Sequence, residues 1–381
     1  MKVVHIITLL ELGGAQRTAL TLVKNLDKSR FETVLLCGSG GLLDPEALES
    51  NVRVTFIPGL NRPIRPLRDV VAFLFLVHAL RRERPQVVHT HSSKAGVLGR
   101  LAAWAAGVPR IVHTVHGFGF TPLQLVLVRT FFVWIEQWLA SITHALVFVS
   151  KANQEEAVRR KIGSADRHVL IRAAVHLKDY LSLSRHREGI PGLALSADDR
   201  LVTTVGPFKP QKNLLDFVRA AERVSAHHGS VRFLVVGDGA GRAELEKAIQ
   251  RAGLTDRVLL AGWRKDGPAL LARTDIFCLT SLWEGLPMAL VEAMAAGLPC
   301  VVNAVDGCRD VIDPGVTGYL TAPGHPEETA EKIIYLLDHP ALASEMGARA
   351  RLSVGHDFDR DQMVRQHEEL YASFFPALQK G

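Results

Sequence analysis

The sequence predicts an α/β protein made of two doubly wound parallel-sheet domains that face each other across a cleft. Three observations carry this prediction. At 381 residues, the chain is too long for one typical hydrophobic core. Short β-rich runs alternate with helical patterns in the first half. The alternation stops over residues 178–199, where the sequence is polar and weakly periodic, and then restarts, so we expect a linker there.

The first half predicts a domain over residues 1–180. A continuously apolar strand such as 145–150 suits a parallel sheet that helices cover on both faces. The expected strands are 2–9, 32–38, 53–58, 86–91, 110–117 and 145–150, and the expected helices are 14–26, 66–83 and 93–106.

The second half predicts another domain over residues 181–359. Its expected strands are 200–206, 231–239, 257–262, 275–281 and 299–304, and its expected helices are 213–227, 241–252, 267–273 and 288–296. The closing segment 360–381 is helical in pattern, and its apolar face leads us to expect that it packs back on the first domain. The "DRD" at 359–361 is expected to cap this helix rather than to bind a metal ion.

Composition restricts the compartment and the partners. The cysteines Cys37, Cys278, Cys300 and Cys308 form no C-x-x-C pair, which is typical of reduced thiols in a cytosolic protein. The first ten residues lack a signal-peptide cleavage site, and no stretch reaches the length of a membrane span. A net charge of +6 indicates an anionic partner. Nucleic acid is not expected, because there is neither an RNA-binding aromatic signature nor helix-turn-helix spacing.

Residues 65–84, "RPLRDVVAFLFLVHALRRER", combine an apolar helix with a basic end. Such a surface suits contact with an anionic membrane, which would make the protein peripheral on the inner face of the cell membrane. The alternative is a buried helix with a solvated tail.

The stretch "EGLPMALVE" places one carboxylate before a helix start and a second inside the helix. Gly285 permits a sharp bend, and Pro287 suits the first turn of a helix. Glu284 then lies near a strand end, where α/β sheets bind ligands. Glu292 lies roughly 6–8 Å further along at 1.5 Å per residue. This geometry favours two contacts on one elongated ligand over an acid and base pair, and a solvated glutamate is the alternative for Glu292.

Two further segments suit phosphate binding. In "VGPFKPQKNL", Gly206 ends a strand, and Lys209 and Lys212 lie in a loop that opens a helix, where fixed ammonium groups can hold a diphosphate. In "ELGGAQ", Gly13 and Gly14 let backbone N–H groups approach a phosphate. Surface lysines and a purely steric turn are the alternatives. The glycines at 237, 239 and 241 do not match a dinucleotide-binding fingerprint.

A group of histidines occupies two neighbouring strands of the first half, at His89, His91, His113 and His116. We expect no metal site, because no carboxylate or cysteine accompanies them at ligand spacing. His116, followed by Gly117 at a strand end, is the best candidate for a polar contact in the cleft.

Taken together, the chain resembles glycosyltransferase family 4, the retaining, nucleotide-sugar-dependent enzymes of GT-B fold. The resemblance runs over nearly the whole chain. It rests on the segments "LGGAQR", "HTHSSKAGVLGR", "HTVHGFGF", "FVSKA", "VGPFKPQKNL", "VVGDG", "LLAGWRKD" and "SLWEGLPMALVEAMAAGLPCVV".

The resemblance implies roles for individual residues. Glu292 would bind the ribose, Glu284 the hydroxyls of the transferred sugar, Lys212 the diphosphate, and His116 would lie beside the anomeric carbon. The other donor-binding candidates are Gly13, Gly14, Gly206, Lys209 and the backbone N–H groups of Leu286, Met288 and Ala289, and the acceptor-side candidates are His91, Ser92 and Lys94.

Two positions depart from the family pattern. Pro207 stands where an arginine usually precedes the phosphate lysine, so Lys209 would supply the second charge. Asp306-Gly307-Cys308 stands where the family usually has Gly-Gly.

The resemblance implies transfer of a hexose or N-acetylhexosamine from a UDP-sugar to a glycan or polyprenyl-diphosphate-linked acceptor, in cell-surface polysaccharide biosynthesis and without a metal or other cofactor. A GDP-mannose-dependent transferase, a UDP-sugar epimerase and a non-catalytic nucleotide-sugar sensor are the alternatives.

Overall fold

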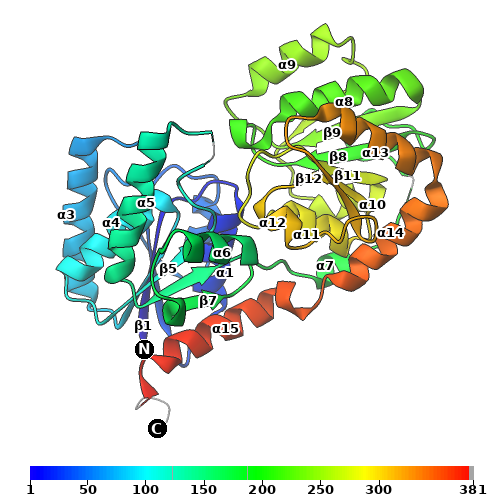
Figure 1. The fold of residues 1–381 in the computed structure, drawn as a ribbon. Coiled ribbons are helices and arrows are strands. Elements are labelled where there is room, and N and C mark those ends of the chain that lie inside the picture. Colours follow the sequence, from blue (N-terminus) through cyan, green and yellow to red (C-terminus); the bar gives the residue numbers. More distant parts are fainter. Residues whose placement is uncertain (122, 187, 377–381) are drawn as a thin grey trace. The chain divides into compact units, whose positions relative to one another are not determined.

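The computed structural model describes residues 1–121, 123–186 and 188–376. The chain divides into two compact units, each with its own parallel sheet (Figure 1). The first unit comprises Met1–Ala174 and the segment from Arg360 onward, and the second comprises Val175–Asp359. Residues 377–381 of the expected closing helix lie outside the described residues.

The first unit contains a seven-stranded parallel sheet in the order β3-β2-β1-β4-β5-β6-β7. Its strands are β1 (Lys2–Leu9), β2 (Glu32–Gly38), β3 (Arg53–Phe56), β4 (Val87–His91), β5 (Arg110–Val115), β6 (Ala145–Phe148) and β7 (His168–Leu170). The central strands are buried along almost their whole length, as expected for a parallel sheet with helices on both faces.

Helices connect these strands: α1 (Gly14–Asn25), α2 (Asp44–Glu49), α3 (Pro66–Glu83), α4 (Ser93–Ala105), α5 (Val126–Ser141) and α6 (Lys151–Arg159). Two glycines let α4 lie close to the sheet. A Cβ atom on Gly96 would lie 2.5 Å from the ring of His113, and one on Gly99 would lie 2.7 Å from Thr90. Alanine at either position would therefore push α4 away from the sheet.

Helix α15 (Arg360–Ser373) returns to the first unit and packs beside α1. It buries Met363, Val364, His367 and Tyr371, and Tyr371 is fully buried among β-strand side chains. The start of the chain and the end of the described chain therefore belong to one unit.

The second unit contains a six-stranded parallel sheet in the order β10-β9-β8-β11-β12-β13. Its strands are β8 (Arg200–Val205), β9 (Val231–Val236), β10 (Val258–Gly262), β11 (Ile276–Leu279), β12 (Cys300–Asn303) and β13 (Gly318–Thr321). Its helices are α7 (Lys178–Leu181), α8 (Leu214–His227), α9 (Arg242–Arg251), α10 (Gly267–Arg273), α11 (Met288–Ala295), α12 (Asp306–Arg309), α13 (Pro326–Asp338) and α14 (Pro340–Ser353).

The segment expected to be a linker, 178–199, is instead part of the second unit. Ile190 is buried in that unit's core, and Arg185 donates to the carbonyl of Thr274 and to Asp275. The expected domain boundary at residue 180 therefore falls inside α7. A few apolar and ionic contacts hold this polar segment in the second unit. The hydrophobic periodicity of the sequence does not reveal them.

Candidate functional site

Both sheets share one topology, in which the strand order reverses beside the first strand of the unit: between β1 and β4, and between β8 and β11. The carboxyl ends of the strands at such a reversal form a crevice where doubly wound folds bind ligands. The residues predicted from sequence to bind the donor in the second unit follow β8 and β11, on either side of its reversal.

Lys212 and Glu284 meet at this edge of the second sheet. The Lys212 ammonium lies 2.5 Å from Glu284 Oε1, which also accepts a 2.7 Å hydrogen bond from the Ser281 hydroxyl. Gln211 Nε2 donates to the other carboxylate oxygen at 3.3 Å. The side chains of Lys212 and Glu284 are only 11% and 7% exposed. The site therefore holds a buried charge pair, and the sequence had identified neither Gln211 nor Ser281 as its neighbours.

The backbone fixes the two loops that carry this pair to each other. The Thr280 hydroxyl donates to the carbonyls of Lys212 and Asn213, and the Leu282 N–H donates to the Gln211 carbonyl at 2.8 Å. The Gln211 amide also donates to the Trp283 carbonyl. The position of the lysine relative to the glutamate is thus set by main-chain contacts as well as by their own attraction.

Gly206 leaves room for the lysine. A Cβ atom there would lie 2.7 Å from Lys212 Cε, so the aliphatic part of the lysine lies against the backbone of Gly206. Gly237, at φ 133°, and Gly239, at φ 156°, pack against the carbonyls of Gly206 and Phe208. These glycines therefore support the loop that carries Lys209 and Lys212.

Helix α11 begins beside this pair. Met288 is its first residue and Pro287 is the N-cap, one position earlier than the first-turn position expected. The first N–H groups of a helix have no partner within it, so those of Met288 and Ala289 can meet a ligand. Glu292 lies one turn further along, about 6 Å by the helical rise, and its side chain is partly exposed.

The Asp306-Gly307-Cys308 departure packs directly on the same loop. A Cβ atom on Gly307 would lie 1.9 Å from the Gly285 carbonyl oxygen, so only glycine permits this approach. Burial raises the pKa of Asp306, and the nearby Glu284 charge adds to this shift. Burial also raises the pKa of the Cys308 thiol well above its usual value, so Cys308 stays protonated and is a packing residue rather than a nucleophile.

The reversal in the first unit lies between the ends of β1 and β4. Gly13 precedes α1 as its N-cap, and Gly14 is the first helical residue. Ser92 caps α4 with a φ of 63°, a strained conformation for a residue other than glycine, and its hydroxyl lies 3.2 Å from Thr8 Oγ1. Such strain costs of order 1–3 kcal/mol and is concentrated at functional sites.

Lys94, an acceptor-side candidate, is already engaged. Its ammonium lies 2.5 Å from Asp69 Oδ1 and donates to the Pro63 carbonyl at 2.6 Å. These contacts fasten the start of α4 to the start of α3.

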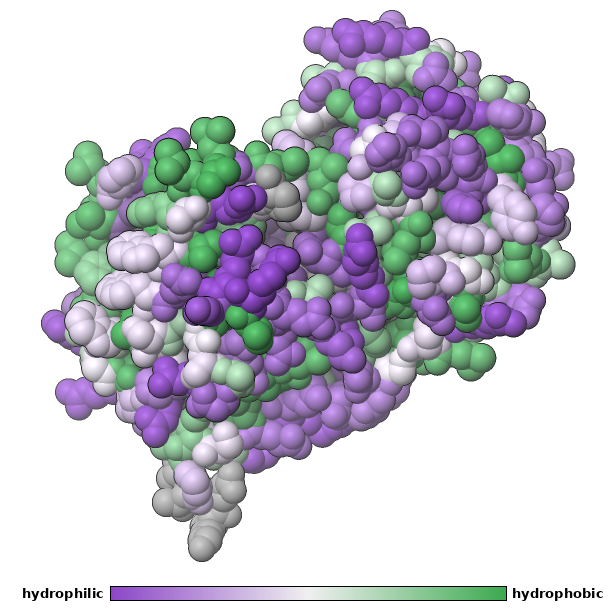
Figure 2. Space-filling view, in the orientation of Figure 1, coloured by the Kyte–Doolittle hydropathy of each residue, from purple (hydrophilic) through white to green (hydrophobic). Residues whose placement is uncertain are grey.

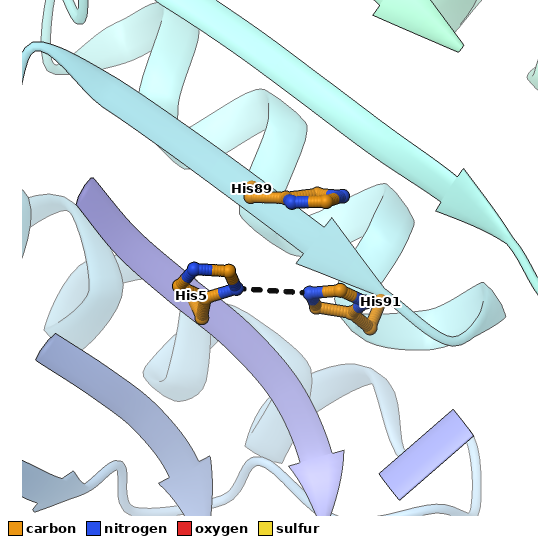
Figure 3. A group of neighbouring side chains, drawn as sticks. All are labelled: His5, His89 and His91. Carbon is orange, nitrogen blue, oxygen red and sulfur yellow. Dashed lines mark hydrogen bonds between the residues drawn. The ribbon is translucent and has the colours of Figure 1, made fainter. Parts of the chain in front are cut away.

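His5, His91 and His116 form a hydrogen-bonded chain that ends at His116. Figure 3 shows its first link, between His5 and His91. His5, on β1, places Nδ1 3.1 Å from Nε2 of His91, whose Nδ1 lies 3.2 Å from Nε2 of His116. The far nitrogen of His5, Nε2, is buried and has no hydrogen-bond partner among the residues that the structure describes. A buried acceptor without a partner costs less free energy than a buried N–H without one. We therefore assign the ring protons so that His5 Nδ1 donates to His91 Nε2 and His91 Nδ1 donates to His116 Nε2. His116 then accepts at Nε2 and carries its proton at Nδ1.

His89 belongs to the same cluster but uses both of its ring nitrogens elsewhere. Nδ1 lies 2.6 Å from the Tyr371 hydroxyl, and Nε2 lies 2.7 Å from Thr114 Oγ1. His5, His89 and His91 each offer a nitrogen within ligand spacing of the others. A metal ion bound by these three histidines would have to displace the hydrogen bonds that His89 already makes. The residues therefore favour hydrogen bonding within the core over metal binding.

Burial keeps these histidines neutral. It lowers the pKa of His5 and of His116 to about 3, and that of His367, on α15, to about 4. The pKa values of His89 and His91 are lowered well below the usual value by burial and by the neighbouring imidazoles. At neutral pH, His116 therefore offers an uncharged imidazole.

Two family models match the chain in succession. Residues 12–178 match the model described as Glycosyltransferase Family 4, and residues 187–353 match the model described as Glycosyl transferases group 1.

Among curated proteins, the chain is 32% identical over 378 residues to the UDP-Gal:alpha-D-GlcNAc-diphosphoundecaprenol alpha-1,3-galactosyltransferase of Escherichia coli. That match covers 97% of this chain and 96% of the relative. The chain is also 28% identical to the N-acetyl-alpha-D-glucosaminyl L-malate synthase of Bacillus anthracis, over 80% of this chain and 79% of that protein.

Among solved structures, Anabaena Alr3699/HepE in complex with UDP and glucose has a TM-score of 0.83 at 21% identity, and it covers 98% of this chain and 100% of its own. Sucrose-phosphate synthase from Thermosynechococcus elongatus has a TM-score of 0.84 at 21% identity, with 99% and 100% covered. These likenesses confirm the expected fold class, two Rossmann-like α/β domains of the GT-B type.

Proposed function

The chain belongs to glycosyltransferase family 4, and from that premise we propose that it moves a hexose or N-acetylhexosamine from a UDP-sugar to a glycan or polyprenyl-diphosphate-linked acceptor in cell-surface polysaccharide biosynthesis. The relative from Escherichia coli supports this choice, because its name specifies UDP-galactose and a diphosphoundecaprenol-linked sugar. The single observation that carries the proposal is the buried pair of Lys212 and Glu284 beside the start of α11.

The pair and the helix suit the two ends of a nucleotide sugar. Lys212 supplies a fixed positive charge for the diphosphate, and the N–H groups of Leu286, Met288 and Ala289 bind sugar and phosphate oxygens. Glu284 accepts hydrogen bonds from the hydroxyls of the transferred sugar, and Glu292 accepts those of the ribose.

Other residues complete the donor contacts in this proposal. Lys209 provides a second cation in place of the arginine that Pro207 replaces, and Gly206 keeps the lysine side chain against the loop. From the first unit, Gly13 and Gly14 contribute backbone N–H groups to the diphosphate. His91, Ser92 and Lys94 remain acceptor-side candidates. His91 is buried and hydrogen-bonded to His116, and Lys94 also holds the start of α4 in place.

The chemistry is a front-face substitution with retention. The bond between the anomeric carbon and the diphosphate oxygen breaks, the acceptor oxygen bonds to the same face, and the leaving phosphate oxygen takes the acceptor proton. No protein nucleophile is required. Lys212 and the helix N–H groups stabilise the departing diphosphate, so the protein needs no metal ion for this step. The neutral His116 donates a hydrogen bond from Nδ1 to the sugar.

The protein would work in the cytosol, on the inner face of the cell membrane where a lipid-linked acceptor is found. In the described part of the chain, no helix combines the length and apolarity of a membrane span. We propose that α3 contacts the membrane through its basic end, at Arg81, Arg82 and Arg84, which are all exposed.

One assay tests the function against its rivals. The protein is incubated with a panel of UDP- and GDP-sugars, with and without a lipid-diphosphate acceptor, and the nucleoside diphosphate and the product mass are followed. A transferase releases the diphosphate and extends the acceptor. An epimerase converts the UDP-sugar without an acceptor, and a sensor binds without release. Either of the last two outcomes would overturn the proposal.

A further inference from the structure

The first unit carries an exposed apolar face that extends well beyond the basic end of α3. In the described part of the chain, most large apolar side chains that face solvent lie on α3, α4 and α5 or just before α5. Among the same residues, the second unit exposes only Leu181, Tyr335 and Leu352. Figure 2 shows hydrophobic residues gathered over α3 and α5 of the first unit.

The centre of this face is a row of four residues on α5, which we call the aromatic stripe: Leu127, Phe131, Trp134 and Trp138. Their spacing of four, three and four residues places them on one side of the helix. They are 84%, 56%, 58% and 49% exposed, and the rings of Phe131 and Trp134 stack with their centroids 6.3 Å apart.

The opposite side of α5 is anchored, so the stripe cannot turn inward. Glu136 forms a buried ion pair of 2.8 Å with Arg100 of α4, whose side chain is fully buried. Val133 and Leu139 are buried on the same side. Rotating the helix to bury the stripe would expose these apolar residues and break the ion pair, which would leave a charge buried alone.

Neighbouring helices extend the apolar face. Helix α4 contacts both α3 and α5, and its Trp104 is 63% exposed. The outer side of α3 adds a second set of exposed apolar side chains, namely Leu67, Val70, Val71, Leu74 and Phe75. Single exposed apolar residues are ordinary, but a face of this extent marks an interaction site.

The charges beside the face indicate what covers it. Exposed arginines lie before and in the first turn of α3, at Arg65 and Arg68, and at its end, at Arg82 and Arg84. Exposed tryptophans beside arginines suit the boundary between anionic headgroups and acyl chains, where an indole has one polar and one apolar side. The exposed cations at both ends of α3 are complementary to anionic headgroups, which favours a bilayer as the occupant.

We propose that this face is a membrane-insertion surface, in which the aromatic stripe of α5 lies in the interfacial layer of an anionic bilayer. Helix α5 has 16 residues, about 24 Å, and is too short to cross a hydrocarbon core of about 30 Å. It therefore lies along the surface. The inference rests on the proposed function in one respect: access to a lipid-linked acceptor is the reason for the protein to contact a membrane.

The test uses vesicles of phosphatidylcholine with a minority of phosphatidylglycerol. The full-length protein should sediment with these vesicles and its tryptophan emission should shift to the blue. Leu127→Ser and Trp134→Ser should each weaken binding by about tenfold, because each withdraws one large apolar side chain. Leu352→Ser is the matched control: Leu352 is also 84% exposed but belongs to the second unit. It should bind as the unaltered protein does.

Vesicle binding that is unchanged in both stripe variants would overturn the inference. So would a concentration-dependent dimer that the stripe variants convert to monomer, because a second copy would then be the occupant. The result is separable from the proposed function: with a short-chain, water-soluble acceptor, the stripe variants should keep normal turnover. Loss of vesicle binding with retained soluble turnover supports the inference. No transfer by the unaltered protein would count against the function alone.

Discussion

At the residue scale, the polar side chains of the two units differ in charge: those of the second unit's site are ionised, and the buried histidines of the first unit are neutral. In the second unit, Lys212 and Glu284 form a nearly buried charge pair, which keeps both groups in place for a charged ligand. In the first unit, the chain from His5 to His116 is neutral, because burial lowers the pKa values of its members. The proposed function uses the charged pair to hold the diphosphate and sugar of the donor, and the neutral His116 as a hydrogen-bond donor to the sugar.

The charge pair predicts that substitutions of its two residues have non-additive effects on the free energy of unfolding. Lys212→Met leaves the Glu284 carboxylate buried without a cation and should lower the free energy of unfolding by roughly 3–5 kcal/mol. Adding Glu284→Gln removes that uncompensated charge, so the double variant should be more stable than Lys212→Met alone. Denaturant unfolding of the three proteins measures this. A double variant less stable than the single one would contradict the account.

The histidine cluster predicts acid lability. The pKa of His5 is about 3 in the folded protein against 6.5 ordinarily, so the unfolded chain binds a proton that the folded chain refuses as pH falls. Stability should therefore be complete above pH 6.5 and be lost between pH 6.5 and about 3, by roughly 1.4 kcal/mol per pH unit for each such histidine. His367→Leu should flatten this dependence down to about pH 4. Identical slopes of unfolding free energy against pH for both proteins would refute it.

At the element scale, the sequence predicted the central strands and the helices that carry the site, because apolar runs and glycine turns mark them clearly. It did not identify the edge strands β7 and β13 as strands, because they have only three and four residues and are partly exposed. Helices α5, α6, α13 and α14 were also not assigned. The polar segment 178–199 looked like a linker because its anchors are few.

The candidate site shows the same limit. Lys212 and Glu284 could be selected as separate residues from their loops, but their direct pairing depends on contacts 72 positions apart along the chain. The same is true of the chain from His5 to His116, since no spacing rule brings β1 to β4.

Close backbone packing makes the loop after β12 a sensitive element. Gly307→Ala would place a Cβ atom 1.9 Å from the Gly285 carbonyl oxygen, so the loop carrying Glu284 must shift. We expect at least about tenfold weaker UDP binding by calorimetry, because a displacement of about 1 Å disturbs contacts at the site. Gly229→Ala is the control, since a Cβ atom added at Gly229 would meet nothing within 4 Å. Equal affinities in the two variants would exclude this coupling.

At the scale of the whole molecule, two sheets share one topology, and doubly wound sheets bind ligands at the strand reversal. The proposed division assigns the charged pair to a donor domain and the neutral histidines to an acceptor domain. In the proposed function, Lys212 and the start of α11 would supply the positive potential that a metal ion supplies in other transferases.

This division predicts that transfer does not depend on a metal ion. Turnover after treatment with a chelator should equal turnover before it, and added magnesium or manganese should not raise it. A loss on chelation that either ion restores would show that the protein groups do not suffice to stabilise the diphosphate.

The most direct test of the central claim is UDP release by Lys212→Ala and Glu284→Ala, measured with the preferred UDP-sugar and a lipid-diphosphate acceptor. Leu352→Ser, on the surface of the same unit, serves as the control. The account predicts a loss of at least about 100-fold in each site variant, because each removes a group that holds the donor, and full turnover in the control. Near-normal turnover in either site variant would contradict it.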